Sequence, residues 1–326
     1  MTSNVKPLKK RDADFRLIDL AGAEESFEEA FLAGMARREK AVPCRFLYDA
    51  RGSALFDKIS TLPEYYPTRA ETAILKSAAG DIAALIGPGA ALIELGSGSS
   101  VKTRILLDRM VAPAAYMPID VSRAHLAQAA RSIADDYPGL AVQAIVADYS
   151  REFPLPATPG RKVAFFPGST IGNLDRNDAR DLLALWRARL GPGGMMIVGV
   201  DLKKDPRVLE AAYDDRAGVT EAFIKNVLAR ANGELGADFD LARFDYDARW
   251  VGPEGRIEMH LASIGAQSVG VAGRRIRLRD GERIHVENSH KYGLEEFSAL
   301  ARSAGFSPLR RFVDPARLFC VHALAA

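Results

Sequence analysis

The chain has 326 residues, of which 48% are hydrophobic and 26% charged, a balance typical of a globular protein with room for a full core. Its formal net charge of +2 gives no reason to expect a nucleic-acid partner or an anionic membrane. No apolar run reaches the length of a membrane span or forms a signal-peptide core, and only two cysteines are present, so we expect a cytoplasmic protein without a disulfide framework.

The N-terminal part of the chain is predicted to contain a tail, helices and an aromatic loop. We expect residues 1–11, which carry four basic side chains, to be disordered. Between residues 62 and 69 two prolines bracket Tyr65 and Tyr66, which predicts either the wall of a pocket or an aromatic cover over the edge of the core. From their apolar periodicity, helices are predicted over residues 15–39, 54–60 and 70–86.

The middle of the chain alternates short apolar runs with amphipathic segments. Strands are predicted over residues 91–93, 115–119, 141–146, 162–166 and 195–200, and helices over 101–110, 122–135 and 177–190. Such an alternation of strands and helices predicts an α/β fold, in which a parallel sheet is covered by helices on both faces.

The composition changes after Pro206. A helical pattern over residues 208–232, interrupted near 214–218, is followed by an aromatic-rich stretch and by segments that alternate as antiparallel strands do. We interpret residues 206–290 as an insertion before the end of the sheet domain. The later predicted elements are strands over 256–263 and 274–278, a helix over 294–304, and two last strands over 309–313 and 318–324.

The stretch Ala91–Thr103 combines a buried strand, a glycine turn and the start of a helix. Gly96 and Gly98 allow a ligand to approach the backbone closely, and the helix start offers free N–H groups, so a cofactor is expected to bind here. Val101 stands where the dinucleotide-binding fingerprint has its third glycine, which argues against a nicotinamide or flavin enzyme. Glu94, directly before the turn, suits either the ammonium group of a methionyl cofactor or the hydrogen bonds that order the loop.

Polar residues follow the other predicted strands, at the edge where ligands of parallel sheets bind. Asp120, Asp148 and Asp201 each follow a strand, and the loop 168–173 follows another. Asp120 can accept both hydroxyls of a ribose, and Asp148 can accept from an adenine amine, with Tyr149 beside the ring. Any one of these acids is equally well explained as a helix cap or a surface charge, but three in succession favour a nucleoside ligand. With the glycine turn, they resemble the cofactor site of class I S-adenosylmethionine-dependent methyltransferases.

Longer blocks of sequence narrow the comparison. The blocks are FLYDARGSALFD (46–57), LPEYYPTRAE (62–71), ELGSGSSVKTRILLD (94–108), PGSTIGNL (167–174), YDDRAGVTEAFIKNVL (213–228) and RIEMHL (256–261). They resemble the histidine-specific Nα-methyltransferases of ergothioneine biosynthesis, and the resemblance runs from about residue 15 to the C-terminus.

The resemblance implies a fold and a division into domains. The fold is α/β, a class I methyltransferase Rossmann-like doubly wound sheet with a second, α+β substrate-binding domain. The implied parts are a disordered tail (1–14), a substrate-binding domain (15–69 plus 206–290) and an S-adenosylmethionine-binding domain (70–205 plus 291–326).

For the cofactor, the resemblance implies binding of S-adenosylmethionine by Gly96, Lys102, Asp120, Asp148 and Tyr149. The family usually has phenylalanine at the place of Tyr149. The glycine turn itself adds Glu94 and Gly98 to the candidate cofactor site. No metal is expected, because the five histidines form no close pair on a helical face and Cys-x-x-Cys does not occur.

For the substrate, the resemblance implies a pocket for the side chain of free L-histidine. Glu287 and Ser289 match the imidazole-recognising pair, and a carboxylate with a hydroxyl can satisfy both nitrogens of the ring. Met259 is expected to pack on the ring, with Gly168 nearby. Without the resemblance, Glu287 and Ser289 would be interpreted as the polar end of an exposed strand.

The amine and carboxylate of the amino acid are expected to lie among Tyr65, Asn173 and Tyr213. Tyr65 is favoured over Tyr66 as the tyrosine that faces the substrate. Asn173 and Tyr213 are the residues expected to orient the amine for the reaction, and the sequence offers no dedicated general base.

The implied activity is trimethylation of free L-histidine to Nα,Nα,Nα-trimethylhistidine (hercynine), with S-adenosylmethionine as methyl donor and the enzyme acting as a monomer. Two alternatives stay open at this point. One is a methyltransferase for another free amino acid or small amine, because few residues determine the side-chain pocket. The other is a non-catalytic nucleoside-binding protein that has kept the glycine turn.

Overall fold

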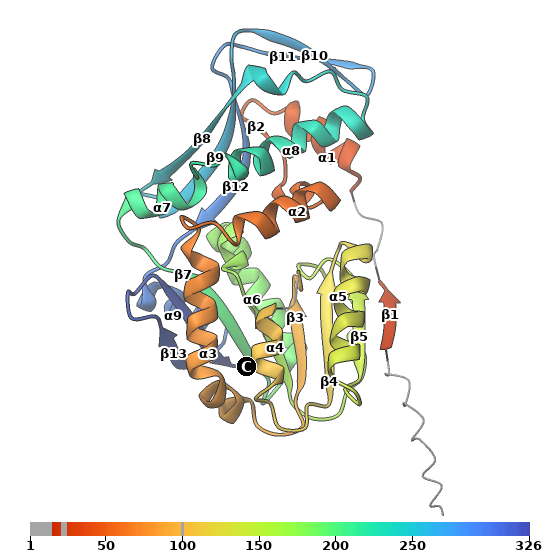
Figure 1. The fold of residues 1–326 in the computed structure, drawn as a ribbon, viewed down its shortest axis with the longest axis vertical. Coiled ribbons are helices and arrows are strands. Elements are labelled where there is room, and N and C mark those ends of the chain that lie inside the picture. Colours follow the sequence, from red (N-terminus) through yellow and green to blue (C-terminus); the bar gives the residue numbers. More distant parts are fainter. Residues whose placement is uncertain (1–14, 21–24, 99–100) are drawn as a thin grey trace, which may run out of the picture.

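The computed structural model describes residues 15–20, 25–98 and 101–326 (Figure 1). The tail predicted at residues 1–11 lies outside these ranges. An eight-stranded sheet lies below a smaller α+β part in the view of Figure 1. Within the described ranges, no helix combines the length and the apolar character needed to cross a membrane.

The large sheet is mostly parallel, and its strand order reverses at β3. The order across it is β1 (Phe15–Asp19), β5 (Val142–Val146), β4 (Ala115–Asp120), β3 (Ala91–Leu95), β6 (Lys162–Phe166), β7 (Met195–Asp201), β14 (Phe319–Ala325) and β13 (Ser307–Val313). Neighbours from β1 to β7 pair in parallel, whereas β14 and β13 are antiparallel. Strands β4 and β6 pair with β3 on its two opposite sides. The carboxyl end of β3 is therefore the point where the strand order reverses, and parallel sheets bind their ligands at such a point.

Helices cover both faces of this sheet. On one face lie α3 (Tyr66–Ile86), α4 (Val101–Leu107) and α5 (Arg123–Asp136); on the other lie α6 (Arg176–Leu190) and α9 (Leu294–Ser303). Consecutive residues of β3 point to opposite faces of the sheet: Leu92 packs with α3, α4 and α5, and Ile93 packs with α6 and α9. Burial on both faces explains why the central strands are uninterrupted apolar runs.

The smaller part is built around a second sheet and its own core. Its sheet has the order β2 (Lys40–Ala41), β12 (Arg283–His290), β9 (Arg256–Ser263) and β8 (Phe244–Val251), and a hairpin of β10 (Gln267–Val271) and β11 (Arg274–Leu278) extends from it. Its helices are α1 (Phe27–Met35), α2 (Ala50–Ile59), α7 (Pro206–Tyr213) and α8 (Val219–Glu234), with short 3-10 turns η1 (Cys44–Leu47) and η3 (Leu241–Arg243). Side chains from residues 27–66 and 209–286 share one hydrophobic core, which joins the N-terminal helices to the late insertion.

Three passages of the chain between the two parts meet at one carboxylate. Asp201, the last residue of β7, accepts a hydrogen bond from Tyr66 at the start of α3, at 2.8 and 2.9 Å to its two oxygens. Lys291, directly after β12, forms an ion pair with Asp201 at 2.7 Å. One residue further along each segment, Leu202 and Tyr292 form a parallel β-bridge. The insertion therefore leaves and re-enters the large sheet at adjacent points.

Most predicted elements are confirmed, and the main error lies at the N-terminal end. The helix predicted over residues 15–39 is wrong in its first half, because Phe15–Asp19 forms β1 and pairs with β5. The helix begins only at Phe27, where Ser26 and Glu29 form a capping box. The domain division placed residues 15–19 with the substrate-binding part, whereas they lie in the large sheet.

Smaller differences lie at other helix starts and in the second sheet. The helix predicted from residue 54 begins at Ala50, since Asp49 Oδ1 accepts the Gly52 N–H at 2.7 Å as an N-cap. The helix predicted from residue 70 begins at Tyr66, with proline in its first turn. Strands β2, β8, β10 and β12 were not predicted.

Candidate active site

The glycine turn after β3 leaves open space at the carboxyl edge of the large sheet. Gly96 and Gly98 have φ values of 71° and 44°, in the left-handed region that favours glycine. A Cβ atom added to Gly96 would approach the Tyr149 ring at 3.7 Å, and one added to Gly98 would meet no atom of the described residues within 4 Å. A turn with room above its backbone suits the close approach of a ligand.

The two acids that follow β4 and β5 form local turns. Asp120 Oδ1 accepts the Ser122 N–H at 2.9 Å, and Asp148 Oδ1 accepts the N–H and hydroxyl of Ser150 at 2.8 and 2.6 Å. Burial raises the pKa of Asp120, against the effect of its hydrogen bonds. Each acid thus makes a local turn with one oxygen, and the other oxygen of Asp148 lies 3.4 Å from Arg151 Nε.

Glu94 points into the core. Its carboxyl is 1% exposed, Thr103 donates to Oε1 at 2.5 Å, and the Tyr116 hydroxyl donates to Oε2. Burial raises the pKa of Glu94 to about 7, although these hydrogen bonds act in the opposite direction. Of the two roles predicted for Glu94, this geometry matches the ordering of the loop.

Lys102 is held by an acid for which the sequence suggested no role. Glu71, on α3, is completely buried; it forms an ion pair with Lys102 and accepts the Gly168 N–H at 2.8 and 3.1 Å. Glu71 therefore fastens a candidate cofactor residue to the loop that carries a candidate substrate residue. Gly199 makes room for this acid, since a Cβ atom there would lie 2.0 Å from Glu71 Oε1.

The variant Gly199→Ala is accordingly expected to be destabilised by about 1–3 kcal/mol, the usual cost of overpacking a filled interior. Gly80→Ala is the matched control. Gly80 lies in α3, where an added Cβ would meet no atom of the described chain within 4 Å, so alanine should stabilise by about 0.4–1 kcal/mol. Urea unfolding of both variants measures the two shifts; equal stabilities would contradict the crowding at Glu71.

A cavity beside this edge gathers the predicted substrate residues. All seven of them line it, and its empty space, the opening included, is about 480 Å³. The seven are Tyr65, Gly168, Asn173, Tyr213, Met259, Glu287 and Ser289. They come from the loop before α3, the 3-10 turn η2 (Thr170–Asn173) and the segment before it, α7, β9 and β12. Side chains from distant parts of the chain that converge on one concave place, with a few polar groups among apolar ones, are typical of a small-molecule site.

One wall of the cavity is polar. Glu287 is 6% exposed, and its Oε1 accepts a hydrogen bond from Asn173 Nδ2 at 2.8 Å. Burial raises the pKa of Glu287 to about 8, and the ammonium group of Lys291 opposes this shift. Beyond Glu287 on the same strand, the Ser289 hydroxyl lies 2.7 Å from that of Tyr213.

The lining also includes aromatic residues that were not predicted as part of the site. Tyr48, Phe56 and Phe223 line the cavity, with ring centroids 5.4–5.9 Å apart, and Phe56 contacts the ring of Tyr65 edge-on. The adjacent tyrosines separate, because Tyr65 lines the cavity whereas Tyr66 turns to Asp201. Tyr65 thus lines the pocket, and both tyrosines are also part of the hydrophobic core of the smaller part, so each of the two predicted roles applies to this segment in part.

Residues next to the site in sequence lie outside the cavity. His285 Nε2 lies 2.8 Å from Asn288 Oδ1, and the His285 ring packs on that of His260. His290 Nε2 lies 3.3 Å from Asp175. Asp201 also departs from its predicted place among ligand-binding acids, since it is fully buried between two lysines. Within the described part of the chain, we find no group of three or more His, Cys, Asp or Glu side chains placed to hold a metal ion.

Comparison with known proteins places this chain among methyltransferases. Residues 27–326 match the family model described as "Histidine-specific methyltransferase, SAM-dependent". The chain is 41% identical to a histidine N-alpha-methyltransferase of Mycolicibacterium smegmatis, over 90% of this chain and 93% of that protein. It is 38% identical to a histidine N-alpha-methyltransferase of Mycobacterium tuberculosis, over 87% and 90%. It is 34% identical to ergothioneine biosynthesis protein 1 of Neurospora crassa, over 81% of this chain and 31% of that protein.

Proposed function

The chain belongs to the family of histidine-specific, S-adenosylmethionine-dependent methyltransferases, and on that premise we propose that it methylates the α-amine of free L-histidine in ergothioneine biosynthesis. The proposed end product is Nα,Nα,Nα-trimethylhistidine. The observation that carries the proposal is the cavity in which Glu287, Ser289, Met259 and Asn173 converge. The domain division is proposed with one change, which leaves β1 with the cofactor-binding sheet.

The residues at the carboxyl edge of the large sheet suit the methyl donor. The open turn gives backbone access, Asp120 and Asp148 each offer a carboxylate oxygen, and the Tyr149 ring lies beside Gly96. Lys102, held by Glu71, adds a positive charge at the same edge. When bound here, S-adenosylmethionine would supply an electrophilic methyl group on a sulfonium. No metal is proposed for the reaction.

The polar wall of the cavity suits the imidazole ring. Glu287 and Ser289 lie two residues apart on β12, so their side chains are on the same face of the strand and can meet the two ring nitrogens. Met259 sits opposite Glu287 on β9, where it can pack on the ring. A buried carboxyl with this arrangement would be left unpaired by a side chain without ring nitrogens, which favours histidine.

The remaining lining groups are proposed to hold the reacting amine. Asn173 uses one N–H for Glu287 and retains a second N–H and its oxygen for the ligand. Together with Tyr65 and Tyr213, it can fix the amino-acid backbone so that the amine lone pair points at the methyl group, and such alignment supplies much of the rate. The amine has to lose its proton first. The aromatic wall of Tyr48 and Phe223 can then accommodate a growing methylated ammonium group, since ring faces attract cations.

The proposal is tested by incubating the protein with S-adenosylmethionine and a panel of free amino acids and following product masses. Histidine is expected to gain one, two and then three methyl groups, whereas phenylalanine stays unmodified because its side chain has no group that can pair with Glu287 and Ser289. Turnover of another amino acid in preference to histidine would support a different substrate. Binding of S-adenosylmethionine with no turnover of any panel member would support a non-catalytic binding protein.

A further inference from the structure

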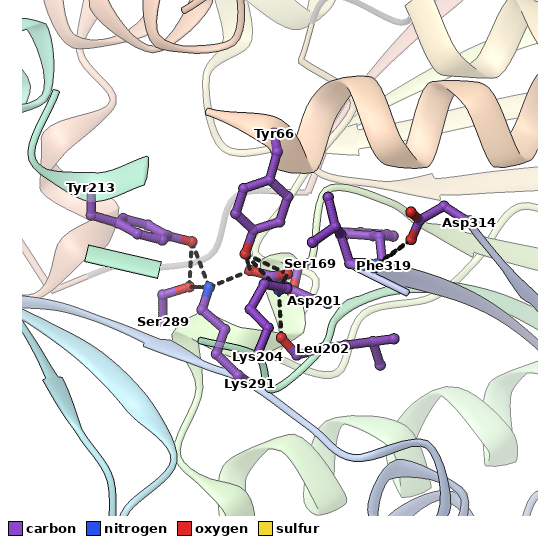
Figure 2. Close-up of polar contacts among 11 residues, drawn as sticks. Tyr66, Ser169, Asp201, Leu202, Lys204, Tyr213, Ser289, Lys291, Asp314 and Phe319 are labelled. Atoms are coloured by element: carbon purple, nitrogen blue, oxygen red, sulfur yellow. Dashed lines mark hydrogen bonds and ion pairs between the residues drawn. The ribbon is translucent and has the colours of Figure 1, made fainter. Parts of the chain in front are cut away.

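Lys291 is a buried lysine in contact with two residues of the substrate cavity. Its side chain is 0% exposed, and its Nζ lies 2.7 Å from each of three oxygens: Asp201 Oδ2, the Tyr213 hydroxyl and Ser289 Oγ (Figure 2). An ammonium group has three hydrogens and no acceptor. All three hydrogens of Lys291 are therefore committed, one to the carboxylate and one to each hydroxyl.

Asp201 fixes the position of this ammonium group. The carboxylate also accepts hydrogen bonds from Lys204 Nζ, at 2.6 Å, and from the Tyr66 hydroxyl. The Asp201 backbone N–H donates to Ser169 Oγ at 2.9 Å. Two lysines thus pair with this single buried carboxylate. Burial would raise the pKa of Asp201, but the two ammonium groups outweigh it and hold that pKa below its usual value.

The contacts of Lys291 determine how many protons the wall can offer to a ligand. Tyr213 and Ser289 both accept from Lys291, and their hydroxyl oxygens lie 2.7 Å apart, so one of the two donates to the other. The Tyr65 hydroxyl, which also lines the cavity, donates a further hydrogen bond to Tyr213. Tyr213 and Ser289 carry two protons between them; one is spent on the hydrogen bond that joins them, and the other is free to point into the cavity that both residues line.

We propose that Lys291 is a positioning residue: by donating to both Tyr213 and Ser289, it leaves this pair of hydroxyls a single proton to donate to a ligand. Histidine must then place a hydrogen-bond acceptor, either its carboxylate or its unprotonated ring nitrogen, against this wall. The inference rests on the function proposed above. It extends that function by assigning to a residue outside the cavity lining the control of how the amino acid is oriented. The alternative is that Lys291 serves stability alone, as the counter-ion of Asp201.

The first experiment compares Lys291→Met with Lys204→Met. Lys204 is the matched control because it is also buried and also bound to Asp201, but it contacts Tyr66 rather than the hydroxyl pair. For Lys291→Met, the KM for histidine is expected to rise about 10- to 100-fold, the range for losing a hydrogen bond to a charged group. The Kd for S-adenosylmethionine, measured by calorimetry, should stay within about two-fold, and Lys204→Met should change both constants by less than about three-fold. Equal rises in KM for the two variants would overturn the proposal.

The second experiment is a double-mutant cycle on histidine binding, measured by calorimetry with S-adenosylhomocysteine present. Lys291→Met is made in the wild-type chain and in the Tyr213→Phe, Ser289→Ala background, where no hydroxyl pair remains. The proposal expects a loss of affinity in the first case and almost none in the second. The same loss in both backgrounds would show that Lys291 acts through stability alone.

Two further controls keep the outcomes distinct. If Lys291→Met does not fold, Lys291→Gln replaces it, since the amide keeps donors toward Asp201 without the charge, and the same comparisons apply. Wild-type protein is assayed beside every variant. Absence of histidine methylation by the wild type would refute the proposed function, whereas an active wild type with an unchanged KM for the Lys291 variant would refute the present proposal alone.

Discussion

Replacing Glu287 by alanine is expected to lower kcat/KM for histidine by about 100-fold or more, because the proposed imidazole site loses the one buried carboxylate that the described residues contribute to the cavity lining. Binding of amino acids without a ring nitrogen should change far less, since they never used that partner. Asn173 would also lose the acceptor that it now contacts at 2.8 Å, so the amine is expected to be held less firmly. Competition assays with histidine and an aromatic amino acid measure the change in discrimination.

Asn288→Ala is the control for this experiment. Asn288 lies next to Glu287 on β12, but its side chain turns to His285 on the other face of the strand. The kcat/KM of the Asn288→Ala variant for histidine should remain within about two-fold of the wild-type value. If Glu287→Ala discriminates between amino acids as well as Asn288→Ala does, Glu287 has no part in recognising the ring.

The variant Asp201→Ala is expected to lose about 3–5 kcal/mol of folding free energy, because the two buried ammonium groups of Lys291 and Lys204 lose their carboxylate partner. Asp181→Ala is the comparison. Asp181 pairs with Arg180 at 2.7 Å on the exposed surface of α6, and such a pair contributes about 0–1 kcal/mol. Urea unfolding at neutral pH gives both values, and a similar small loss for the two variants would contradict the importance of the buried centre.

The pH dependence of the same measurement follows from the lowered pKa of Asp201. A carboxyl group whose pKa is lower in the folded chain than in the unfolded chain stabilises the fold above its unfolded pKa, and this contribution is lost as the pH falls through the folded value. The stability difference between the wild type and Asp201→Asn should therefore be complete at neutral pH and decrease below about pH 4. A difference that grows toward acid pH would contradict the assigned charge state.

The sheet of the larger domain could be predicted from sequence because its strands are buried on both faces. An uninterrupted apolar run that ends at a glycine or an acid, as in β3 and β7, has few other interpretations. The edge strand β1 gives no such signal: its residues are only partly buried, and their spacing also fits a helix. Strands β8 and β12 mix buried with half-exposed polar positions, so their pattern is equally weak.

The candidate substrate residues were reached through resemblance, and the structure places all seven in one cavity. The supporting residues could not be found in this way. Glu71 contacts Lys102 and Gly168, and Lys291 contacts Asp201 and Tyr213. In each case the partners are far apart in sequence and come together only on folding. A single buried charge carries no periodicity, so only the folded arrangement identifies its partners.

The meeting of three chain passages at Asp201 has a mechanical consequence. Tyr66 begins α3, Asp201 ends β7 and Lys291 follows β12, so the bonds among them hold these three segments at a common point. Sliding of the smaller part along the large sheet would break this buried ion pair, so the pair opposes such a movement. The cavity wall at Ser289 is tied to this anchor through Lys291, whereas the hairpin of β10 and β11 lies at the end of the smaller part that is farthest from the large sheet (Figure 1).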